Sequence, residues 1–157
     1  MDNIIDVTFN FEAYEDVALN RVKKFNEAAD QVADIKEIYE ELKVKMQEDS
    51  VFAEISKLFG GKLVADIVDA IACLEVQAKL LKHSFEFLIK IMRARVNYIV
   101  DKYSQDEIYG NFKLRTEMQT LNKKIKKYEN VLDSNLKIAA QYKLSDFGLE
   151  IEGEPGM

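Results

Sequence analysis

The stretch that decides the fold is IVDAIACLEVQAKLLKHSFEFLIKIMRARVNYI, residues 67–99. Its apolar side chains recur in alternating steps of four and three residues. A second tract, LRTEMQTLNKKIKKYENVLDSNLKIAAQY, residues 114–142, keeps the same alternation. An apolar period of 3.5 residues held over this length is typical of a helix seam that packs against another helix. At 1.5 Å per residue the tracts are about 48 and about 42 Å long, so we expect them to pair as an antiparallel hairpin.

The predicted seam residues share this heptad spacing. They are Ile67, Ile71, Leu74, Leu81, Phe85, Leu88, Met92 and Ile99 on the first tract, and Leu114, Met118, Leu121, Ile125, Leu132 and Asn135 on the second. The hairpin alone cannot cover all the apolar positions of the first tract. Each large apolar side chain left in water forfeits about 1.5–3 kcal/mol. We therefore expect an N-terminal helix to cover one side of the seam and a second copy of the chain to cover the rest.

The whole chain is predicted to be all-α. A coiled-coil-like hairpin, residues 63–103 and 112–143, is joined by an N-terminal helix and a short helix within one helical domain, residues 12–143. One proline and six glycines leave long stretches without a helix breaker. Residues 5–11 alternate apolar and polar side chains, which favours an extended arm over residues 1–11. Residues 144–157 form an acidic tail, in which residues 147–152 show the same alternation. The alternative for both ends is a frayed terminus.

Several local signals set the helix boundaries. Asn10 is a good N-cap for the first helix, and Ser50 is expected to cap a short second helix. Gly60-Gly61 is expected to end that second helix, because glycine accepts the left-handed conformation that follows a helix. Ser104 and Glu107 have the spacing of a capping box. The turn of the hairpin is predicted at residues 109–111.

Two seam positions are polar. In a hairpin that turns near residue 108, Arg95 falls opposite Glu117, and we predict an ion pair between them. Asn135 occupies another seam position, where a buried asparagine fixes helix register and number at some cost in stability. The alternative for both residues is a side chain that reaches solvent at the edge of the seam.

Residues suited to catalysis or metal binding are sparse. The single histidine, His83, and the single cysteine, Cys73, lie ten residues apart and do not supply the three or four ligands that zinc requires. We expect Cys73 to be buried as a small hydrophobic residue, and His83 to lie on the helix surface or at the edge of the core. We predict no cofactor, no metal site and no enzymatic activity. One cysteine fits a reducing compartment, so a cytoplasmic location is expected, and no uncharged apolar run is long enough to span a membrane.

Charge is distributed unevenly along the chain. Residues 1–78 carry 17 acidic and 8 basic side chains, residues 79–144 carry 7 acidic and 14 basic, and residues 145–157 carry 4 acidic and no basic ones. Such asymmetry bears on association rather than on fold. The residues that could contact nucleic acid are Arg93, Lys102, Lys113, Arg115, Lys123, Lys124, Lys126 and Lys127. In the acidic tail Phe147, Leu149 and Ile151 could form a docking peptide.

These features favour a non-catalytic, homo-oligomeric assembly or adaptor protein whose partners are itself and other proteins. The first alternative is a nucleic-acid-binding accessory factor, of the packaging or recombination type, that uses the basic hairpin. The second alternative is an inhibitor that binds one host enzyme through the acidic N-terminal half. The richness in Lys, Ile, Asn and Glu suits a phage or mobile element with an AT-rich genome.

Overall fold

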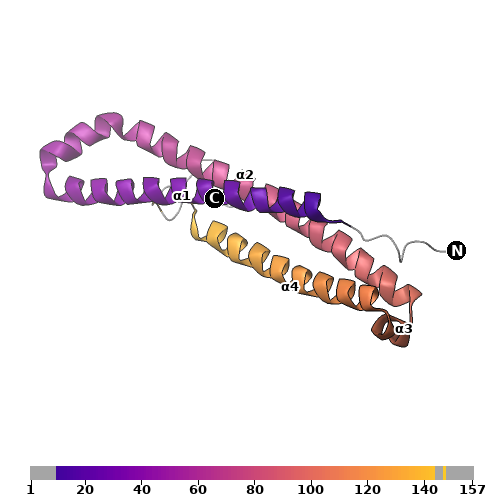
Figure 1. The fold of residues 1–157 in the computed structure, drawn as a ribbon. Helices are drawn as coiled ribbons and strands as arrows, with labels where there is room; N and C mark the ends of the chain where they lie inside the picture. The colour runs from indigo at the N-terminus through magenta and orange to yellow at the C-terminus, as the bar shows by residue number, and fades with distance from the viewer. Residues whose placement is uncertain (1–9, 144–146, 148–157) are drawn as a thin grey trace, which may run out of the picture. The chain divides into compact units, whose positions relative to one another are not determined.

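The structure is a computed structural model of the 157-residue chain, and it describes residues 10–143 and 147. The side chains of residues 55, 56 and 58–60 are not part of this description. The described residues form four helices, α1 (Glu12–Glu48), α2 (Ser50–Lys102), α3 (Gln105–Gly110) and α4 (Phe112–Gln141), shown in Figure 1. This confirms the predicted all-α fold dominated by long helices. Of the predicted arm at residues 1–11, residues 1–9 lie outside the described residues.

The chain divides into two compact units. Unit 1 contains residues 1–22 and 80–135, and unit 2 contains residues 23–79 and 136–157. Each unit has its own buried apolar side chains, so each can be described by itself. Whether residues 12–143 behave as the single domain expected from the sequence stays a prediction.

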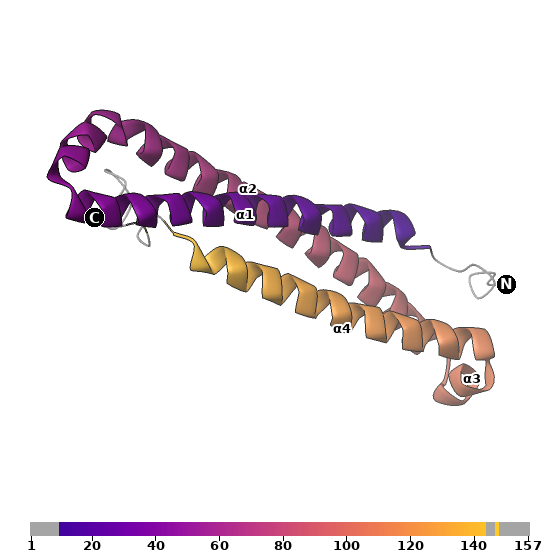
Figure 2. The same cartoon turned by 60° about the vertical axis from the view of Figure 1, so that its left-hand side comes forward.

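Unit 1 contains the hairpin. The second half of α2 and most of α4 run antiparallel, joined through α3, as Figures 1 and 2 both show. The buried side chains of this unit come from all three long helices: Ala18, Leu81, Phe85, Leu88, Ile89, Met92, Ile99, Leu114, Leu121, Ile125 and Tyr128. Phe85 and Tyr128 meet edge to face across the hairpin, with ring centroids 5.8 Å apart. The heptad tracts thus close on each other within one chain.

The turn of the hairpin follows the predicted capping signals. Ser104 Oγ accepts a hydrogen bond from the backbone N–H of Glu107 at 3.2 Å, and the Glu107 side chain accepts one from the Ser104 N–H at 3.2 Å. This is the reciprocal capping box, and it starts α3. Asn111 then caps α4 by accepting a hydrogen bond from the Leu114 N–H at 3.1 Å. The chain reverses over residues 103–111.

Unit 2 is built on the antiparallel turn between α1 and α2. α1 ends at Glu48, and the residue that caps α2 is Asp49, whose Oδ1 accepts hydrogen bonds from the N–H groups of Val51 and Phe52 at 3.0 and 3.2 Å. Ser50 is already helical, so its predicted capping role is wrong. The buried side chains of this unit are Phe25, Ala28, Ala29, Val32, Ile67, Ala70, Ile71, Leu74 and Phe147.

The predicted helix end at Gly60-Gly61 is wrong, because α2 runs through both glycines without a break. A glycine inside a helix costs about 0.5–1 kcal/mol relative to alanine, which is too little to stop a helix that continues on both sides. A Cβ added to Gly61 would meet nothing within 4 Å. The predicted short helix and the long helix that was expected to begin at residue 63 are therefore one helix of 53 residues.

Candidate interaction surfaces

The predicted seam residues lie in the interior of the chain. All of them are buried except Met118 and Leu132, which are half-buried. Ile67, Ile71 and Leu74 belong to the core of unit 2, and the others belong to unit 1. Because one copy already covers these side chains, a second copy would have to bind to other residues than those assigned to it from the sequence.

The polar residue Arg95 lies opposite Glu117, as the heptad spacing of the two tracts predicts, and the two side chains form a pair. Its Nε donates to Glu117 Oε2 at 2.7 Å, and its Nη2 donates to Oε1 at 3.0 Å. The side chains are 4% and 16% exposed. This bidentate, buried contact confirms the predicted ion pair. A charge can be buried here because its partner supplies two charge-assisted hydrogen bonds.

A second polar cluster, partly buried and missed by the sequence reasoning, joins α1 to α4. The carboxylate of Glu15 accepts hydrogen bonds from the Tyr128 hydroxyl and from Lys124 Nζ, the latter at 2.9 Å. Burial raises the pKa of the Glu15 carboxyl, but these hydrogen bonds and the charges of Lys124 and Lys127 outweigh burial and leave that pKa below its ordinary value. Burial, the Glu15 contact and the nearby charge of Asp16 all raise the pKa of the Tyr128 hydroxyl. The cluster fastens the first turns of α1 onto the hairpin.

Asn135, the other polar seam residue, is buried, but its amide is satisfied locally. Nδ2 donates to the Val131 carbonyl of the same helix at 2.8 Å. This is the i to i−4 pattern that polar side chains adopt inside helices. The register-setting role predicted for Asn135 therefore remains a prediction.

The predicted basic surface divides into engaged and outward-facing residues. Lys124 binds Glu15, Arg93 pairs with Glu129 at 2.9 Å, and Arg115 donates to the Tyr109 carbonyl at 2.9 Å. The Lys102 ammonium and the Arg115 guanidinium also lie over the rings of Tyr98 and Phe112. Of the eight predicted contact residues, Lys113, Lys123, Lys126 and Lys127 are exposed on α4, although Lys127 also lies over the Tyr128 ring. We call Lys123, Lys126 and Lys127 the lysine stripe.

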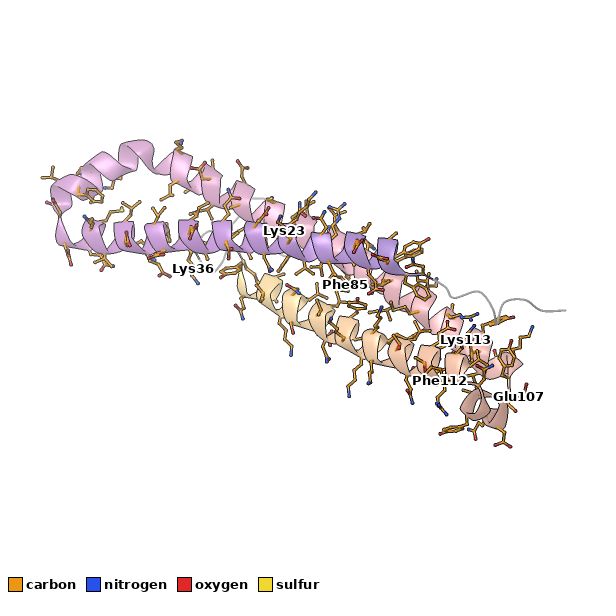
Figure 3. All side chains as sticks on the ribbon, in the orientation of Figure 1. Lys23, Lys36, Phe85, Glu107, Phe112 and Lys113 are labelled. Carbon is orange, nitrogen blue, oxygen red and sulfur yellow. The ribbon has the colours of Figure 1, made fainter. Side chains whose placement is uncertain are left out.

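The α3 end of the hairpin is mixed in charge. Figure 3 labels Glu107 on α3 and Phe112 and Lys113 at the start of α4. Tyr109 and Phe112 are the most exposed large hydrophobic side chains of the described residues. Asp106 and Glu107 lie on α3, so the aromatic rings are set among charges of both signs.

A mostly apolar groove lies between the start of α1 and the second half of α2. It has two hollows, of about 390 and about 290 Å³, which share Tyr14. The first is lined by Asn10, Phe11, Tyr14, Ile91, Ala94, Arg95 and Tyr98, and the second by Tyr14, Val17, His83, Ser84 and Phe87. We call this feature the α1/α2 groove. No carboxylate is among its lining residues.

The groove carries large apolar side chains in contact with solvent. Val17 is 56% exposed and Phe87 is 52% exposed, and the rings of Tyr14 and Phe87 lie 5.7 Å apart. Sequence reasoning missed this surface, although a signal was present. Ser84, Phe87, Ile91, Ala94 and Tyr98 follow a second heptad track beside the seam. A wide apolar face of this kind indicates that one helix contacts more than one partner helix.

The acidic tail meets the helices at one described residue. Phe147 is buried, and its carbonyl accepts a hydrogen bond from the Tyr39 hydroxyl at 2.6 Å. The two rings pack edge to face with centroids 5.7 Å apart. Phe147 is thus held by its own unit 2 and is not presented to a partner. Leu149 and Ile151, the other predicted docking residues, lie outside the described residues.

Two residues considered for chemistry lie on the helix surface. His83 is exposed on α2, at the edge of the groove, as expected. Cys73 is exposed, so the expectation that it is buried is wrong; it occupies the outer side of α2, beside the buried Ile71 and Leu74. Among residues 10–143 and 147, no three His, Cys, Asp or Glu side chains gather to hold a metal ion. None of the helices formed by these residues has the length and apolar character required to cross a membrane.

The fold and its surfaces define an all-helical protein built from long antiparallel helices. Comparison of the chain with protein-family models, curated proteins and solved structures found no match. Inferences about function therefore come from the residues themselves.

Proposed function

We propose that this chain is a non-catalytic assembly or adaptor protein that acts through protein–protein contacts and associates with itself. The observation that carries the proposal is the α1/α2 groove. Its exposed Val17 and Phe87 remain uncovered although the long heptad seam is already buried. Exposed apolar surface concentrated in one hollowed strip is characteristic of interaction sites, and it is costly to leave in water.

The two polar clusters support a structural role for the charged side chains that they contain. Arg95 binds Glu117, and Glu15 binds Tyr128 and Lys124. In both clusters the partners use their charges and hydrogen bonds on each other. These contacts position the helices around the groove, and nothing in them resembles a base oriented toward a substrate site.

Sedimentation equilibrium across a concentration series tests the proposal. The native chain should show a mass that rises above the 18.1 kDa of one copy as concentration increases. Val17→Ser and Phe87→Ser should weaken association, whereas Val100→Ser should leave it unchanged. Val100 is a matched control, because it lies on α2 like Phe87 and is similarly exposed, at 53%, but does not line the groove. A mass of 18.1 kDa at every concentration would contradict self-association.

A nucleic-acid-binding function is the second candidate, favoured by one observation. Lys123, Lys126 and Lys127 of the lysine stripe are exposed on α4 close together along the helix. If they bind phosphates, affinity for single- or double-stranded DNA should fall steeply with salt, and replacing all three by Gln should reduce the salt slope by about 2–3. Absence of binding at low salt would remove this candidate.

A further inference from the structure

We propose that the acidic C-terminal segment, residues 148–157, of one copy binds in the α1/α2 groove of a neighbouring copy. This inference rests on the self-association proposed above and names the contact that produces it. The segment begins directly after Phe147, which is anchored on Tyr39 in unit 2. The ten residues that follow this anchor lie outside the described residues.

Charge is the first argument for this occupant. Residues 148–157 carry three carboxylates, Glu150, Glu152 and Glu154, and no basic side chain. The lining of the groove contains no carboxylate, and its one arginine, Arg95, is buried and paired with Glu117. The three carboxylates of the segment therefore meet no like charge among the residues that line the groove.

Apolar pattern is the second argument. Leu149 and Ile151 alternate with Glu150 and Glu152, so an extended chain places both apolar side chains on one face and both carboxylates on the other. Two residues of extended chain rise about 6.6 Å. Four residues of helix, such as those from Phe87 to Ile91, rise about 6 Å. The two apolar side chains of the segment therefore match successive turns of the groove wall.

The exposed surface at the two hollows supplies the driving force. Val17 and Phe87 are each more than half exposed in one copy, and Tyr14 lines both hollows. Seating Leu149 and Ile151 against these side chains removes apolar area from water on both sides of the contact.

Binding of a labelled peptide tests the contact directly. The probe is a fluorescent peptide of residues 148–157, and the receptor is the chain truncated after Phe147, which keeps the buried anchor. Fluorescence anisotropy should show saturable binding. Phe87→Ser in the receptor should weaken it about tenfold, as expected when roughly half the burial of one large apolar side chain is lost. Val100→Ser should not change it. A peptide with Leu149→Ser and Ile151→Ser should not bind, and circular dichroism checks that each receptor variant is folded.

Sedimentation of the full chain separates this inference from the proposed function. Truncation after Phe147 should abolish self-association, and mixing the truncated chain with full-length Phe87→Ser should restore a heterodimer, because each then supplies what the other lacks. Self-association that survives truncation would overturn the tail contact and leave the proposed function standing. A full chain that stays monomeric while the peptide binds its truncated form would place the tail in its own groove, which overturns both the exchange between copies and self-association. A peptide that does not bind the receptor also overturns the tail contact.

Discussion

Removing the carboxylate of Glu117 should cost this protein a large part of its stability. Arg95 is 4% exposed, and it donates two hydrogen bonds to Glu117, at 2.7 and 3.0 Å. Glu117→Ala leaves the guanidinium buried and deprived of this carboxylate. Breaking a buried pair in this way typically costs about 3–5 kcal/mol, against a total of about 5–15 kcal/mol for a folded chain.

The structure offers a matched control for this experiment. Arg93 and Glu129 also join α2 to α4, with a similar distance of 2.9 Å, but their side chains are 54% and 45% exposed. Glu129→Ala should therefore cost less than about 1 kcal/mol. The two pairs join the same helices but differ in burial and in the number of hydrogen bonds, so the comparison measures what a buried, bidentate pair adds over an exposed one.

Urea unfolding followed by circular dichroism measures both effects. The midpoint for Glu117→Ala should fall well below that of the native chain, and the midpoint for Glu129→Ala should stay close to it. The double variant Arg95→Met with Glu117→Leu should recover most of the loss, since well-packed apolar side chains can replace a buried pair. If Glu117→Ala costs no more than Glu129→Ala, the buried pairing described here is incorrect.

Three further predictions concern α2, the Glu15–Tyr128 contact and the lysine next to the stripe. Gly61→Ala should raise the free energy of unfolding by about 0.5–1 kcal/mol in urea, because the added methyl group has no atom within 4 Å and alanine favours the helix. A loss of stability would contradict a continuous α2. The melting temperature should fall in acid as Glu15 is protonated, since its lowered pKa contributes stability only above the ordinary carboxyl range. It should also fall in alkali, because the raised pKa of Tyr128 contributes stability that is complete below about pH 10 and is lost as the pH rises through the folded value. Glu15→Gln should flatten both limbs, and an unchanged pH profile would count against the contact. Gel-shift assays on DNA should show no change for Lys124→Gln if that lysine is committed to Glu15, whereas loss of binding would assign it to phosphate.

Much of the fold could be predicted from the sequence because the heptad spacing is long and only Arg95 and Asn135 interrupt its apolar residues. The heptad spacing alone located the hairpin and placed Arg95 opposite Glu117. The capping box at Ser104 was also predictable, because both of its hydrogen bonds join residues three positions apart. Such local patterns depend on few distant contacts.

The errors arose where local propensity competes with the wider helix. Gly60-Gly61 is typical of a helix end, but the apolar residues on both sides continue α2 through it. Asp49 and Ser50 are both good capping residues, and the sequence alone does not decide which of two adjacent residues is helical. The prediction for Cys73 followed residue type, whereas its exposure follows its position on the outer side of α2.

The interaction surfaces were harder to predict because they depend on where α1 lies. The contact of Glu15 with Tyr128 and Lys124 joins residues more than a hundred positions apart. The α1/α2 groove likewise requires Tyr14 to lie beside Phe87. The second heptad track on α2 indicated a further partner for that face, but it did not specify whether that partner is α1, another copy or both.

Cross-linking within the hairpin tests most directly the claim that the two heptad tracts meet in a single chain and leave association to the groove. Arg93 and Glu129 are exposed and in contact across α2 and α4, so both can be replaced by cysteine in a Cys73→Ser background and joined with a short bis-maleimide. The cross-linked product should run as one chain on a denaturing gel at every protein concentration. Covalent dimers as the main product, or no cross-link at all, would contradict a hairpin closed within one copy.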